Sequence, residues 1–157
     1  MRRLPGLFAF CFVLLVALPA AAQDVFRAEL VGAGGTPVIL TPESIAGLPP
    51  VEMDVAYQTS KGMSGGRFGG VLFWDVLAAS KAFEGLEHNA ELARTFVVTA
   101  GDGYAIAFSV GEIHPDFGNT PMILADRLDG RPLEGGWRIV VPGGARNVRD
   151  VVRIELR

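Results

Sequence analysis

The sequence predicts a single α+β domain, mostly strand, in which a mixed sheet or flattened barrel packs against a few short helices. Two observations lead to this prediction. Short alternating or apolar runs recur between glycine and aspartate turn signals, and only a few segments show helical spacing. Residues 23–157 contain no internal repeat, low-complexity tract or linker, so they are expected to fold as one unit.

The expected strands follow from alternation and from apolar runs. Gly101-Asp102-Gly103 and Asp129-Gly130 are turn signals that separate some of these runs. The strands are expected, in order, at residues 24–32, 38–40, 51–57, 96–100, 104–110, 121–128, 137–142 and 148–157.

The expected helices are short. Residues 41–48 form the first, with Thr41 as its cap, Pro42 at its first position and Gly47 at its end. Apolar residues at helical spacing predict a second helix. The remaining helical segments, the second helix included, are expected at residues 71–83, 89–95 and 111–114.

Residues 58–70, "QTSKGMSGGRFGG", contain five glycines and no apolar period. The composition predicts a long loop. Loops of this length in compact domains are often functional or mobile, although a flexible hairpin tip also fits the sequence.

The first 22 residues have the features of a secretory signal peptide. Arg2 and Arg3 precede the apolar run "LFAFCFVLLVAL", and small residues before Gln23 fit a cleavage site. We therefore expect an exported, periplasmic protein with no stable membrane insertion after cleavage. Cys11 is the only cysteine, so the mature domain is expected to contain no thiol.

Composition also limits the partners and the chemistry. The chain has 17 acidic and 14 basic residues and no basic run, which argues against a nucleic-acid partner. His88 and His114 are the only histidines and lie far apart in the sequence, so no metal site is predicted. The glycine-rich segment lacks the Gly-Lys-Ser/Thr of a nucleotide-binding loop.

The most specific chemical feature lies near the C-terminus. Pro142-Gly143-Gly144 predicts a turn whose backbone N–H groups can converge on an anion. Arg146 and Arg149 follow it, and the planar guanidinium group suits an oxyanion. In the alternative interpretation these arginines pair with surface carboxylates such as Glu155 or Asp150.

Four segments together resemble the sulfite-oxidase-like molybdopterin-binding domain family. The last of them, "GGWRIVVPGGARNVRDVVRIEL", is similar to the closing Arg-Val-Val-Val-Pro-Gly and Gly-Ala-Arg-x-Val-Lys segment of that family. The resemblance covers roughly residues 27–157. The other three segments, in the order of the family, are "FGGVLFWDVLAA", "GDGYAIAFSVGEI" and "MILADRLDGRPLEGG".

The resemblance implies a mixed α/β fold that holds the phosphate tail of a pterin cofactor in a basic pocket. It matches Arg146 to the family's arginine, Arg149 to a lysine, and Tyr104 approximately to a tyrosine near the molybdenum. The glycine turn is about two residues shorter here than in sulfite oxidases.

One departure decides the expected function. The redox members bind molybdenum through a cysteine, and the corresponding place here falls near Gln58 and Thr59. Neither side chain supplies a thiolate. We therefore expect a non-catalytic module that carries no cofactor. It would bind a small anion or an envelope protein through the basic turn with Gly143, Gly144, Arg146 and Arg149, together with the loop at residues 58–70 and Tyr104.

Two alternatives remain open at this stage. In the first, the protein is a molybdenum-cofactor oxidoreductase that binds the pterin through Arg146, Arg149 and loop N–H groups, with Thr59 or solvent at the metal. Tyr104 and Arg67 would then orient an oxyanion or sulfoxide-type substrate. In the second, it is an accessory or sensory subunit of an envelope system. An exposed apolar patch around Phe68 and Trp74 would favour the second.

Overall fold

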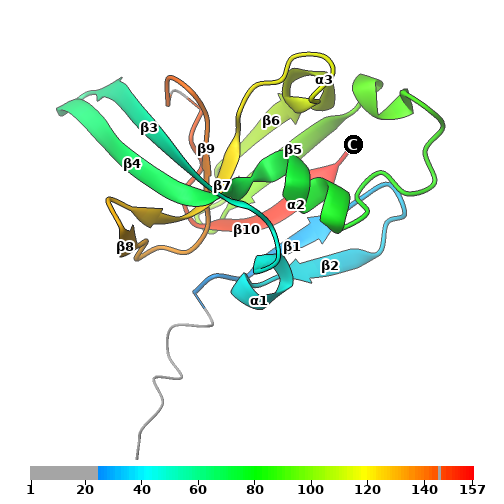
Figure 1. Cartoon of the computed structure of the whole chain (residues 1–157), viewed down its shortest axis with the longest axis horizontal. Helices are drawn as coiled ribbons and strands as arrows, with labels where there is room; N and C mark the ends of the chain where they lie inside the picture. The colour runs from blue at the N-terminus through cyan, green and yellow to red at the C-terminus, as the bar shows by residue number, and fades with distance from the viewer. Residues whose placement is uncertain (1–24, 145) are drawn as a thin grey trace, which may run out of the picture.

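The computed structural model describes residues 25–144 and 146–157. The predicted signal peptide and Cys11 lie outside the described residues. The described chain is mixed helix and sheet, mostly strand, and its strands form two sheets rather than a closed barrel (Figure 1). The expectation of a mostly β, mixed domain is met, whereas the flattened barrel is replaced by two separate sheets.

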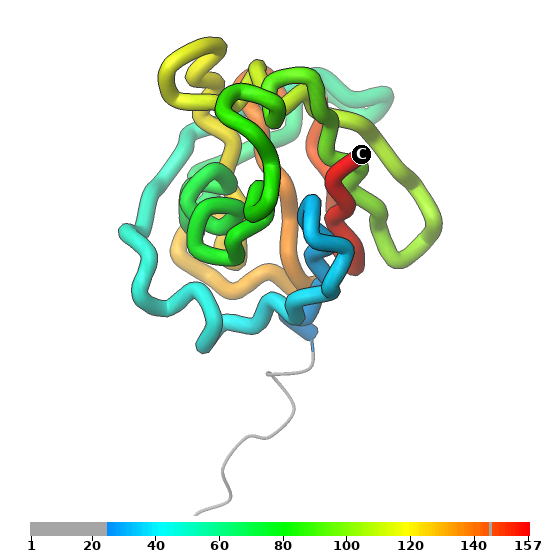
Figure 2. Tube along the Cα trace, turned by 90° about the vertical axis from the view of Figure 1, so that its right-hand side faces the viewer, coloured from blue at the N-terminus to red at the C-terminus, as the bar shows by residue number. Residues whose placement is uncertain are grey.

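The first sheet has the strand order β2-β1-β10-β5-β6. β1 and β10 are parallel, and the other neighbours are antiparallel. The first and last strands of the described residues therefore lie side by side, as the blue and red tubes of Figure 2 show. The strand bounds are β1 (Ala28–Val31), β2 (Pro37–Leu40), β5 (Thr95–Ala100), β6 (Ala105–Ser109) and β10 (Val151–Leu156).

The second sheet has the order β3-β4-β7-β8, and β9 also pairs with β7. All its pairings are antiparallel. β3 and β4 form a long hairpin that extends away from the rest of the molecule (Figure 1). The strand bounds are β3 (Pro50–Thr59), β4 (Gly62–Leu72), β7 (Ile123–Leu128), β8 (Arg131–Pro132) and β9 (Arg138–Val140).

The expectation of a long loop at residues 58–70 is wrong. These residues form the tip of the hairpin and most of β4, in continuous register with β3. The two strands approach each other so closely that only glycine fits at position 65. A Cβ there would lie 1.9 Å from the Val55 carbonyl oxygen. Composition suggested a loop, but the glycines allow close contact between strands.

The helices are shorter than the sequence pattern suggests. α1 (Pro42–Ile45) has the expected Thr41 cap and a capping box with Ser44. The helix predicted at residues 71–83 is observed as α2 (Phe73–Ala79). Residues 71 and 72 belong to β4 instead. The other helices are the 3-10 turn η1 (Ala90–Ala93) and α3 (Val110–Ile113).

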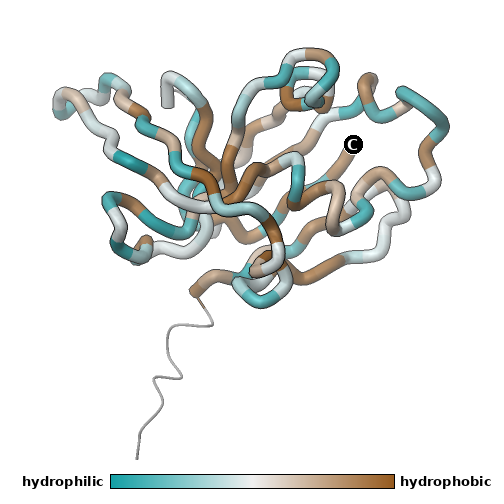
Figure 3. The backbone as a smooth tube through the Cα atoms, in the orientation of Figure 1, coloured by the Kyte–Doolittle hydropathy of each residue, from teal (hydrophilic) through white to brown (hydrophobic). Residues whose placement is uncertain are grey.

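The second sheet carries apolar residues on both of its faces. Leu124 and Ile139 belong to the main core, which also contains Trp137 and the inner face of the first sheet. Their neighbours Ile123 and Val140 belong to a smaller cluster with Phe68. Figure 3 shows polar and hydrophobic residues mixed along the hairpin, and hydrophobic residues concentrated where the strands meet. The smaller cluster forms the floor of the candidate site.

Candidate functional site

The structure separates the arginines that the sequence grouped as one basic turn. Arg146 makes a two-pronged ion pair with Glu112 of α3, and the Nη1–Oε2 distance is 3.2 Å. Its guanidinium carbon also lies 5.1 Å from the centre of the Phe108 ring. Hydrogen bonding to Glu112 raises the pKa of Arg146 above its usual value. The carboxylate partner therefore exists, but it is Glu112 rather than Glu155 or Asp150.

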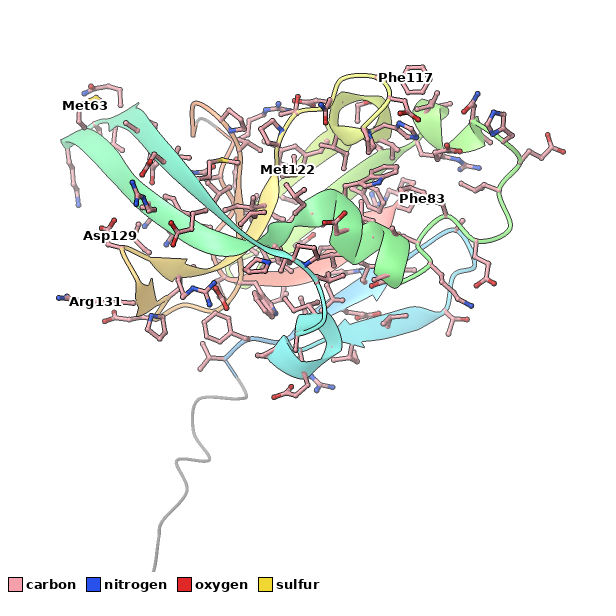
Figure 4. The ribbon with its side chains drawn as sticks, in the orientation of Figure 1. Met63, Phe83, Phe117, Met122, Asp129 and Arg131 are labelled. Atoms are coloured by element: carbon pink, nitrogen blue, oxygen red, sulfur yellow. The ribbon has the colours of Figure 1, made fainter. Side chains whose placement is uncertain are left out.

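Arg67 lies on the opposite face of the hairpin from Tyr57. It pairs with Asp54 across the strands, with an Nε–Oδ1 distance of 3.0 Å, and its backbone N–H donates to Asp129 Oδ1 at 2.9 Å. Asp54, Arg67 and Asp129 line a shallow surface hollow beside the β7–β8 turn. Figure 4 shows Asp129 and Arg131 at that turn, below the hairpin whose tip carries Met63.

Thr59 and Gln58 stabilise the hairpin turn itself. The Thr59 hydroxyl donates to the Gly62 carbonyl oxygen at 2.7 Å and accepts from the Lys61 N–H at 3.1 Å. The Gln58 amide donates to the Thr59 carbonyl oxygen at 3.1 Å. Both side chains are thus engaged in local hydrogen bonds at an exposed tip.

Tyr104 is exposed on the β5–β6 turn, where its N–H donates to Asp102 Oδ1 at 2.9 Å. Among the described residues it makes no hydrogen bond or ion pair with Arg146 or Arg149. The sequence-level grouping of Tyr104 with those arginines remains a prediction.

The predicted turn at Pro142-Gly143-Gly144 is present, and both glycines have positive φ angles of 77° and 66°. The Gly144 N–H donates to the Val141 carbonyl oxygen at 3.0 Å, so this group is used within the turn. Gly144 also packs directly against the Tyr57 ring, which brings the turn onto the inner face of the hairpin.

The structure reveals an arginine that the sequence analysis did not select. Arg138 lies on β9, on the same face as Val140, and its guanidinium carbon is 5.3 Å from the centre of the Phe68 ring. Its Nε is buried without a hydrogen-bond partner. Burial lowers the pKa of Arg138, and the charge of Arg149 lowers it further. Within the described chain no carboxylate forms an ion pair with either arginine.

Tyr57 hydrogen bonds with Arg149 and also feels the charge of Arg138. It lies on β3 opposite Ser64 of β4 and is half-buried. Two hydrogen bonds lower the pKa of the Tyr57 phenol. The one with Ser64 has the larger effect and the one with Arg149 the smaller, and burial acts in the opposite direction. Arg138, Arg149, Tyr57 and Ser64 therefore form one cluster, which we call the Arg138 cluster. Its hydrogen-bond donors and two positive charges suit an anion.

A sequence signal for Arg138 existed. It is the only charged residue in the buried run "WRIVVP", and a charge within such a run usually has a specific partner. Tyr57 had no comparable signal, because an aromatic residue in an alternating strand is ordinary.

Other sites are less supported. In residues 25–144 and 146–157, no group of three or more His, Asp or Glu side chains is arranged to hold a metal ion. None of the helices there has the length and apolar character that a bilayer crossing requires. Phe68 is buried and Trp74 packs partly buried on the core, so they do not form an exposed patch.

A solved structure with a similar arrangement is the sulfane dehydrogenase SoxCD from Paracoccus pantotrophus. The match has a TM-score of 0.66 and 19% sequence identity, and it covers 89% of this chain and 40% of that one. The two chains share a coarse fold. The present chain spans about two fifths of the length of the SoxCD chain. No protein-family model matches the chain, and no curated protein sequence does so either.

Proposed function

We propose that this protein is an exported, non-catalytic module of the sulfite-oxidase-like molybdopterin-binding fold that binds a small oxyanion at the Arg138 cluster. The fold assignment is supported by the four sequence segments and by the similarity to the dehydrogenase. The anion assignment rests on one observation. The charge of Arg149 disfavours the charged form of Arg138, and no described carboxylate forms an ion pair with either arginine.

Neighbouring like charges destabilise each other most where water is partly excluded. Burial removes part of the water that would screen Arg138, and the Phe68 ring offsets this only in part. An oxyanion between the two guanidinium groups would remove the repulsion and accept several hydrogen bonds. Arg146 is already paired with Glu112, so it contributes less to this site than the sequence suggested.

The residues near the expected metal position do not suit molybdenum. A soft thiolate would be required there, whereas Gln58 and Thr59 present only amide and hydroxyl groups that hold the hairpin turn. We therefore assign no reaction step to a metal or a pterin. The possible role as an accessory subunit loses its main support because the Phe68 side chain is buried.

The test is sulfate binding by protein produced from the full chain, measured by calorimetry at constant ionic strength. Replacing Arg149 with Gln should weaken binding about tenfold or more, since a charged hydrogen-bonding partner is lost. Arg138→Lys separates charge from the planar geometry of arginine and should also weaken binding. Arg94→Gln is the control. It removes one positive charge, as Arg149→Gln does, but at an exposed position outside the cluster.

Equal sulfate affinity in the wild type and in both cluster variants would contradict the proposed site. Elemental analysis of protein purified from its native envelope tests the non-catalytic part separately. Near-stoichiometric molybdenum in that sample would overturn it and favour the oxidoreductase alternative.

A further inference from the structure

Tyr57 is directed into the Arg138 cluster from the hairpin. Ser64 faces it across the β3–β4 pair, Arg149 hydrogen bonds with it, and the charge of Arg138 also acts on it. The residue is half-buried, so it is not sealed inside the core. Its hydroxyl is a neutral hydrogen-bonding group beside the two arginines of the cluster.

Gly144 restricts where the Tyr57 ring can lie. A Cβ at position 144 would be 2.3 Å from Tyr57 Cδ1 and 2.6 Å from its Cγ. Separations this short are not tolerated between carbon atoms, so the glycine backbone fits against the ring only because it has no side chain. Gly143 differs in this respect: its φ is also positive, but a Cβ there would meet nothing within 4 Å.

We propose that Tyr57 is a third binding residue of the anion site, donating its hydroxyl hydrogen to the bound oxyanion, and that Gly144 is the positioning residue that holds its ring there. This inference rests on the proposed function, because it assigns further residues to the same site.

The assignment has a consequence for pH. The charged groups that face Tyr57 are Arg138 from β9 and Arg149 from the segment before β10, while Ser64 from β4 is neutral. An ionised Tyr57 would lose its donor and place a negative charge beside both arginines, where it would compete with the ligand. Because the Tyr57 pKa is lowered, sulfate binding should weaken as the pH rises, beginning below the ordinary tyrosine pKa of about 10.

The positioning role is tested by comparing Gly144→Ala with Gly143→Ala. Both variants place alanine at a positive φ, so they share that backbone strain, but only the first methyl group meets Tyr57. Sulfate affinity should fall about tenfold in Gly144→Ala and less than about twofold in Gly143→Ala. Equal effects of the two changes would contradict the positioning role.

A spectroscopic titration reads Tyr57 directly. The chain contains two tyrosines, so Tyr104→Phe leaves Tyr57 as the only one. In that background Gly144→Ala should raise the Tyr57 pKa, because the ring moves away from Ser64 and Arg149, whereas Gly143→Ala should leave it unchanged. If Gly144→Ala prevents folding, adding Tyr57→Ala removes the clashing ring and should restore folding.

Tyr57→Phe tests the donor role. It should weaken sulfate binding at neutral pH and abolish the alkaline decrease in affinity. A variant that binds as tightly as the wild type with the same pH profile would overturn the donor role while leaving the two-arginine site intact. If the wild type binds no sulfate, the proposed function and the donor role both fail, and the tyrosine titration still decides whether Gly144 positions the ring.

Discussion

At the scale of single residues, the basic groups of this protein differ according to their partners. Arg146 is paired with Glu112, Arg67 is paired with Asp54, and Arg138 has no carboxylate partner among the described residues. An arginine in a short sequence motif carries no information about which of these conditions applies. The unpaired one is the better candidate for an external anion.

Arg146 and Glu112 are predicted to act as a structural pair. A double-mutant cycle with Arg146→Ala and Glu112→Ala should give a coupling free energy of only about 0.5–1 kcal/mol, because both side chains remain partly exposed. Urea denaturation measures this coupling. A large loss of sulfate affinity in Arg146→Ala without any loss of stability would instead show that Arg146 binds the ligand.

Gly65 is predicted to be essential for pairing within the hairpin. Gly65→Ala should destabilise the protein by about 3 kcal/mol or more, since its Cβ would collide with the Val55 carbonyl oxygen and its φ is 145°. Thermal unfolding measures the change. Gly47→Ala is the control, because no atom lies within 4 Å of its Cβ position and its φ is not positive. Similar melting temperatures in the two variants would contradict the strand register.

At the scale of elements, glycine content predicted a loop where the structure has a strand. Five glycines removed the apolar alternation from residues 58–70, yet the ladder with β3 is continuous. The helix at residues 71–83 was shortened for a related reason, because β4 extends to Leu72 to pair with β7. Tertiary pairing overrode local propensity in both places.

The cap of α1 is a local feature that the sequence predicted correctly. Thr41→Ala should reduce the free energy of unfolding by about 1 kcal/mol, because the Ser44 N–H loses its side-chain acceptor. Chemical denaturation measures the loss. Thr36→Ala, at an exposed loop position, should change stability by less than about 0.5 kcal/mol. An equal effect at both positions would show that the cap contributes nothing specific.

At the scale of the whole molecule, the last strand, β10, pairs with the first strand, β1. It lies between β1 and β5, so the first sheet cannot form until the last strand is in place. Pairings so distant in sequence are typical of slowly folding β-rich domains. The same closing segment brings Arg149 next to the hairpin, so folding of the sheet and formation of the Arg138 cluster are connected.

Two substitutions on β10 test this arrangement. Ile154→Ala should cost about 2–5 kcal/mol, because Ile154 is fully buried in the main core. Val152→Ala on the same strand should cost less than about 1 kcal/mol, because Val152 is 40% exposed. Urea denaturation compares them. If Val152→Ala were the more destabilising change, the inward face of β10 would be the opposite one.

The sequence by itself determined the strand-rich domain, most strand positions, the α1 cap and the turn at Gly143 and Gly144. These features depend on alternation, on glycine and proline geometry and on contacts within a few residues, all of which are local. Only the tertiary structure decided the site. Arg138 comes from β9, Tyr57 from β3 and Arg149 from the segment before β10, and their approach depends on sheet order. Whether an arginine has a carboxylate partner is likewise a long-range property, which is why Arg146 was selected and Arg138 was missed.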